Sequence, residues 1–107
     1  MKTYSGEQLP TYQVSGQELR IHWDAREVPA PSMGDEPRTQ WEQNEALCGV
    51  ADSLGQIISA IIRSVYSIDA EFAAINNAES DPAEYAAFQA FRAQAKALAD
   101  GWVVSQT

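Results

Sequence analysis

The chain has 107 residues and few of the side chains from which crosslinks and metal sites are made. Cys48 is its only cysteine, so no internal disulfide can form, and His22 is its only histidine. One cysteine and one histidine cannot supply the sulfur and nitrogen ligands of a typical closed zinc site within one subunit. We therefore expect no metal and no cofactor, and we expect Cys48 to be a small buried apolar residue.

Positive charge is also scarce. Seven Lys and Arg residues face fifteen Asp and Glu residues, which leaves a formal net charge of -8. Phosphate backbones and anionic membranes are bound by clustered Lys and Arg. We therefore expect neither nucleic acid nor a membrane as a partner, and we interpret the acidic surface as a source of solubility.

Long apolar runs are missing as well. The start of the chain has no apolar run of signal-peptide length, and no segment approaches the roughly 20 apolar residues of a membrane span. We expect the protein to be made, and to stay, in the cytoplasm.

Motifs that carry chemistry are absent too. The six glycines are dispersed and form no phosphate-cradling loop, and no serine lies in a nucleophile elbow. The oxygen-rich stretch 76–84 lacks the spacing of a calcium loop and reads as one helix ending and another beginning. The sequence therefore predicts no enzymatic activity.

The residues that are present predict one α+β domain over 1–107. Hydrophobic residues make up 45% of the chain, which is typical of a globular protein. A β-rich part is expected at about 11–48, where alternation and the Ser15-Gly16 pair predict a hairpin. Three prolines at 29–38 predict an exposed loop. Residues 39–48 are expected to form a third strand or an irregular edge.

Three helices are expected in the second half, at about 53–64, 68–77 and 82–100. Ser53 with Gln56 predicts a capping box for the first helix, and Ser67 is the expected cap of the second. The third helix has Pro82 at its first position, and Gly101 is expected to end it. The second helix is expected to pack through an apolar face that consists of Ile68, Phe72 and Ile75.

Two sets of residues are candidate sites. If strand alternation holds, His22 and Asp24 share one face, and we expect them to be a solvent-facing structural pair. Trp23 and Trp41 are expected to cover the helices. The chain has more large aromatic rings than a small core requires, so a partner surface is predicted among them, at Trp41, Tyr85, Phe88, Phe91 and Trp102.

Several segments carry a resemblance to a known family. They are Arg63–Glu71, Ile75–Asn77 and Glu84–Arg92, preceded by Trp23-Asp24 and Gln40-Trp41-Glu42 in the β-rich part. Over roughly residues 17–100 the chain resembles small uncharacterised proteins of prophages and tailed phages, whose genes look like neighbours of tail or tail-fibre genes. No catalytic residues are carried over by this resemblance.

The resemblance implies a non-enzymatic structural or assembly accessory of the phage tail region. Its partner would be a tail or tail-fibre component, or a second copy of the chain. The protein would act in the host cytoplasm during assembly or belong to the virion. The alternatives are a small ligand-binding or enzymatic domain that uses His22 and Asp24, a regulatory binding module of the host, and a homodimer with only a structural role.

Overall fold

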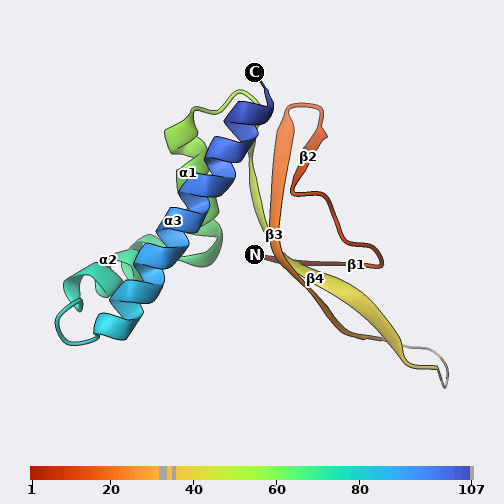
Figure 1. Cartoon of the computed structure of the whole chain (residues 1–107), viewed down its shortest axis with the longest axis horizontal. Helices are drawn as coiled ribbons and strands as arrows, with labels where there is room; N and C mark the ends of the chain where they lie inside the picture. Colours follow the sequence, from red (N-terminus) through yellow and green to blue (C-terminus); the bar gives the residue numbers. More distant parts are fainter. Residues whose placement is uncertain (32–33, 35, 107) are drawn as a thin grey trace.

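Four strands in the first half of the chain form an antiparallel sheet, and three helices follow them (Figure 1). The computed structural model describes residues 1–31, 34 and 36–106. The elements are β1 (Lys2–Ser5), β2 (Tyr12–Ser15), β3 (Glu18–Ala30), β4 (Arg38–Gly49), α1 (Leu54–Val65), α2 (Ile68–Asn76) and α3 (Pro82–Ser105). The predicted α+β fold class is confirmed.

The strand order in the sheet is β1-β4-β3-β2. The predicted hairpin is confirmed, since Ser15 pairs with Glu18 across a tight turn in which Gly16 has a positive φ of 62°. A residue without a side chain adopts that conformation at little cost. The sheet also contains β1, which lies before the predicted β-rich part and pairs with residues 41–44 of β4.

β3 and β4 form a longer hairpin than the sequence predicts. Residues 39–48 belong to β4, which confirms the strand expected there. Pro29 and Ala30, however, belong to β3 and pair with Thr39 and Arg38, so the loop predicted over 29–38 is wrong at its ends. β2 pairs only with residues 18–21 of β3, so the far end of β3 is an edge, where proline is tolerated. Ser32, Met33 and Asp35 of the predicted loop lie outside the described residues.

The sheet has a helix-covered face and a second face that residues 6–11 cross. We call residues 6–11 the crossing segment, because it must connect β1 at one edge with β2 at the other. The side chain of Gln43 holds it in place: its amide oxygen accepts from the backbone N–H of Leu9 at 2.7 Å, and its amide nitrogen donates to the carbonyl oxygen of Leu9 at 3.1 Å.

The core lies between the other face of the sheet and the helices. Leu19, Ile21 and Trp23 alternate along β3 and are buried, as their spacing predicts. α1 and α3 cover this face in Figure 1. Their buried apolar side chains are Ile57, Ile61, Ile62, Phe88, Ala95, Ala99 and Trp102.

The predicted helix starts are confirmed. Ser53 and Gln56 form the reciprocal hydrogen bonds of a capping box, and Ser67 accepts from the backbone N–H of Ala70. Asp81 caps α3 by accepting from the backbone N–H of Glu84 at 3.1 Å. These bonds use N–H groups that have no partner within the first turn.

The predicted end of the third helix is wrong. α3 continues through Gly101 to Ser105, and Gly101 does not adopt a left-handed conformation. A Cβ atom at this position would overlap the hydroxyl oxygen of Tyr12. The absence of a side chain at Gly101 therefore allows β2 to lie close to α3, and this residue does not terminate the helix.

Candidate interaction surface

The sequence predicts that His22 faces solvent, but the structure buries it. It is 1% exposed, on the sheet face that the crossing segment covers. Its Nε2 lies 2.9 Å from a carboxylate oxygen of Glu45, directly opposite on β4, and its Nδ1 lies 2.8 Å from the carbonyl oxygen of Pro10. Both partners are acceptors, so the two hydrogen bonds form together only when both ring nitrogens carry hydrogen. Both ring nitrogens of His22 are therefore engaged within the fold.

Asp24 lies on the opposite side of the sheet from His22. A bulge between Trp23 and Arg26 interrupts the alternation, and Asp24 has a positive φ of 54°. Its carboxylate accepts from the side-chain amide of Gln94 on α3 at 3.1 Å. The expected His22–Asp24 pair is therefore wrong, because a bulge reverses the side to which the following residue points.

Glu42 forms a second charged cluster at the far end of the hairpin. Arg26 donates to its carboxylate through two nitrogens, each at 2.8 Å, and the Lys2 ammonium lies 3.6 Å away. The hydrogen bond from Arg26, then that from Tyr4, lowers the pKa of the Glu42 carboxyl below its ordinary value. The hydrogen bond between Tyr4 and Glu42 also raises the pKa of the Tyr4 hydroxyl. These opposite charges attract one another and so stabilise the pairing of β1 and β3 with β4 at this position.

The sequence gives only a weak signal for these buried polar groups. The polar run Glu42 to Glu45 counts against a strand when one apolar face is expected. In the structure Glu42, Gln43 and Glu45 are all buried, because both faces of β4 are covered or paired there. A polar run inside a strand between Trp41 and Leu47 is the feature that points to such pairing.

The fold buries some of the residues predicted to form an aromatic partner surface and leaves others partly exposed. Phe88 and Trp102 are buried in the chain's own core, and Phe91 packs against that core with its ring centroid 6.3 Å from that of Trp23. Tyr85 and Trp41 are partly exposed. By alternation from the buried Ala46, Trp41 lies on the face away from the helices, so it does not cover them as expected. Phe88 and Trp102 are therefore unavailable to a partner in this fold.

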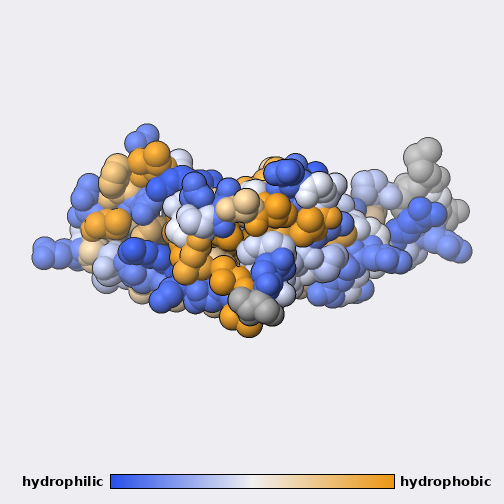
Figure 2. Space-filling model, turned by 90° about the horizontal axis from the view of Figure 1, so that it is seen from above, coloured by the Kyte–Doolittle hydropathy of each residue, from blue (hydrophilic) through white to orange (hydrophobic). Residues whose placement is uncertain are grey.

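α2 presents apolar side chains to solvent. Ile68, Phe72 and Ile75, which we call the α2 stripe, are 55%, 58% and 41% exposed. The expectation that they pack against the core is wrong: α2 contacts the body chiefly through α3, and Ala74 is its buried residue. Figure 2 shows apolar atoms at the surface of the end of the molecule where α2 lies. The stripe has the i, i+4, i+7 spacing of one helix face.

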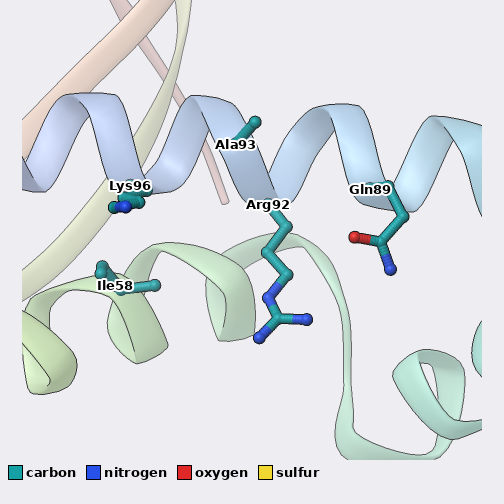
Figure 3. Close-up of a pocket in the computed structure, with 5 residues that line it drawn as sticks. All are labelled: Ile58, Gln89, Arg92, Ala93 and Lys96. Atoms are coloured by element: carbon teal, nitrogen blue, oxygen red, sulfur yellow. The ribbon is translucent and has the colours of Figure 1, made fainter.

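A groove lies between α1 and α3. It has a volume of about 310 Å³ and is lined by Ile58 of α1 and by Gln89, Arg92, Ala93 and Lys96 of α3. Figure 3 shows the strands behind these two helices, so the groove opens on the side away from the sheet. The sequence carries no signal for this groove, because only tertiary packing brings α1 and α3 together.

No group of three or more His, Cys, Asp or Glu side chains that could hold a metal ion occurs among residues 1–31, 34 and 36–106. In the same part of the chain, no helix is long and apolar enough to cross a membrane. Comparison with protein-family models, with curated protein sequences and with solved structures finds no match.

Proposed function

We propose that this chain is a non-enzymatic protein–protein interaction protein, and that the α2 stripe contacts the partner. The observation that carries the proposal is the exposure of Ile68, Phe72 and Ile75 on one face of one helix. Single exposed apolar residues are ordinary, but a contiguous helical row of them is typical of a binding face. Amphipathic helices bind grooves of other proteins through residues at this spacing.

The energetics favour association. Transfer of a large apolar side chain from water into an interface contributes about 1.5–3 kcal/mol before the entropy of association is subtracted. α2 packs on the chain's own core mainly through Ala74, which has a small side chain. The larger side chains are therefore left for a second protein.

The alternative site is not favoured by the geometry. His22 is bonded at both ring nitrogens beneath the crossing segment, and Asp24 is bonded to Gln94 on the other side of the sheet. An acid–base pair needs a group within hydrogen-bond reach of a substrate. Neither side chain of this pair is placed to work with the other.

The resemblance of the sequence to proteins of prophages and tailed phages supports a specific partner class. We propose that the partner is a tail or tail-fibre component and that the role is structural or accessory, in assembly of the tail region. The acidic surface of this chain, with a net charge of -8, would keep it soluble until it meets that partner.

The test is capture of purified proteins encoded beside this chain's gene. Wild type is compared with the double variant Ile68→Ser/Phe72→Ser and with Val14→Ser as the matched control. Val14 is 52% exposed on β2, far from α2 along the chain. We expect wild type and Val14→Ser to retain the partner and the double variant to lose at least about tenfold in affinity.

Light scattering over a concentration series distinguishes a second copy of this chain from a different protein as the partner. A dimer that the double variant abolishes would identify the α2 stripe as a self-association surface. If wild type, the double variant and Val14→Ser all capture the partner equally well, the α2 stripe is not the contact surface. Absence of binding to every neighbour, combined with a monomer at all concentrations, would overturn the proposal.

A further inference from the structure

The groove between α1 and α3 is lined by two cations, and neither forms an ion pair with an acidic side chain in the part of the chain that the structure describes. Arg92 and Lys96 are four residues apart on α3 and both line the groove. Like charges at this spacing destabilise a helix by a few tenths of a kcal/mol. Both residues are exposed, so their side chains are open to a ligand from solvent.

Four of the other five cations of the chain are paired, and Arg38 is the fifth, which forms no ion pair among the described residues. Lys2, Arg20, Arg26 and Arg63 each form an ion pair with a glutamate. Within residues 1–31, 34 and 36–106, neither Arg92 nor Lys96 forms one, although the chain has fifteen acidic residues. Asp100 lies one turn beyond Lys96 and does not pair with it.

The remaining lining residues define what else the site can hold. Gln89 adds an amide that can donate hydrogen bonds, and Ile58 supplies an apolar side chain from α1, whereas the methyl group of Ala93 points away from α1 in Figure 3. In Figure 3 the side chains of Gln89 and Arg92 extend from α3 toward the side on which α1 lies, and Lys96 lies near Ile58. An Arg guanidinium binds carboxylate and phosphate groups with two parallel hydrogen bonds, and a Lys ammonium adds a point charge.

We propose that this groove binds a small amphipathic anion. The ligand has an apolar body of a few carbons, which contacts Ile58, and a carboxylate or phosphate group, which Arg92, Lys96 and Gln89 hold. A volume of about 310 Å³ suits a ligand of this size, near the lower end of small-molecule pockets. The site is separate from the α2 stripe, so it does not depend on the proposed function.

The experiment is a titration followed by the backbone amide spectrum of the isotope-labelled protein. The probes are hexanoate, hexyl phosphate and hexan-1-ol, which share an alkyl chain and differ in the head group. We expect saturable shifts at residue 58 and over 89–96 with one or both anions and none with the alcohol. The anion that binds more tightly identifies the head group.

The variant Arg92→Gln/Lys96→Gln tests the assignment, with Arg20→Gln/Arg38→Gln as a control of equal net charge. Removal of two charged hydrogen-bond donors should weaken binding at least about tenfold, and the control should stay within about twofold. Each variant's own spectrum reports whether it is folded. The proposal is overturned if neither anion gives saturable shifts, if the alcohol binds as well as the anions, or if the groove variant retains wild-type affinity.

Discussion

The hydroxyl group of Tyr12 lies where a side chain at Gly101 would have to be. It donates a hydrogen bond of 2.6 Å to the carbonyl oxygen of Leu98, three residues before Gly101 on α3. The ring of Tyr12 also packs against that of Trp102, with 5.7 Å between the centroids. Burial raises the pKa of the Tyr12 hydroxyl. This contact joins β2, at one edge of the sheet, to the last turns of α3.

We predict that Gly101→Ala destabilises the protein by about 1–3 kcal/mol, the usual cost of an added group in a filled space. In an ordinary helix interior the same substitution would stabilise by up to about 1 kcal/mol. The sign of the change therefore reports the contact with Tyr12. Urea unfolding of the two proteins measures it.

A double-mutant cycle with Tyr12→Phe provides the control for Gly101. Phenylalanine lacks the hydroxyl oxygen that the new Cβ would overlap. In that background we expect Gly101→Ala to be neutral or stabilising. A cost of the same size in both backgrounds would contradict the role assigned to the hydroxyl.

Glu45, which pairs with a buried side chain, should be more important to stability than Glu18, which forms an exposed pair. Glu45→Ala leaves the buried His22 ring without the partner of its Nε2, so we expect a loss of about 1–3 kcal/mol. Glu18→Ala breaks a 2.6 Å pair with Arg20 that is exposed and screened by water, so a smaller loss is expected. Denaturant unfolding of both variants makes the comparison, and equal losses would contradict the structural role of the His22–Glu45 pair.

Glu42 should contribute to the acid sensitivity of the fold. Arg26, and then Tyr4, lowers the pKa of its carboxyl from the ordinary 4.5, so the folded state favours the charged form. A lowered folded-state pKa stabilises above the unfolded-state value, and that stability is lost as the pH falls through the folded-state value. Glu42→Gln should therefore be less stable than wild type at neutral pH, with the difference shrinking below about pH 4.5.

Thermal unfolding over a pH series measures this effect. Glu79→Gln, which changes an exposed carboxylate in the turn between α2 and α3, is the control and should follow the wild-type curve. A constant difference between Glu42→Gln and wild type at every pH would show that the carboxylate does not titrate against Arg26.

Cys48 should react slowly in the folded protein. The structure buries Cys48 only in part, so the expectation of a buried residue is wrong. Desolvation by this partial burial, with a smaller effect of Asp52, raises the pKa of its thiol from 9.0 to about 11. At pH values well below 9, a shift of two units reduces the thiolate fraction about 100-fold, and the thiolate is the reactive form. Alkylation by iodoacetamide, followed by mass spectrometry, should therefore be about 100-fold slower than in denaturant and rise about tenfold per pH unit. A rate equal to that of the unfolded chain would contradict the partial burial of this thiol.

The sequence by itself determined the features that depend on neighbouring residues. Ser53, Ser67 and Asp81 start the helices because each cap bonds a backbone N–H three residues away. The alternation of Leu19 and Ile21 predicted the buried face of β3, since successive side chains point to opposite faces of a strand.

Only the tertiary structure decided the features that depend on distant partners. Gly101 is a packing residue because Tyr12, 89 positions earlier in the chain, lies against it. His22 is buried because the crossing segment covers it and Glu45 lies opposite. The groove and the α2 stripe exist because α3 packs against α1 while α2 contributes little more than Ala74 to the core. Spacing along a chain predicts which side chains share a face, but which of those faces is covered depends on contacts between segments far apart in sequence.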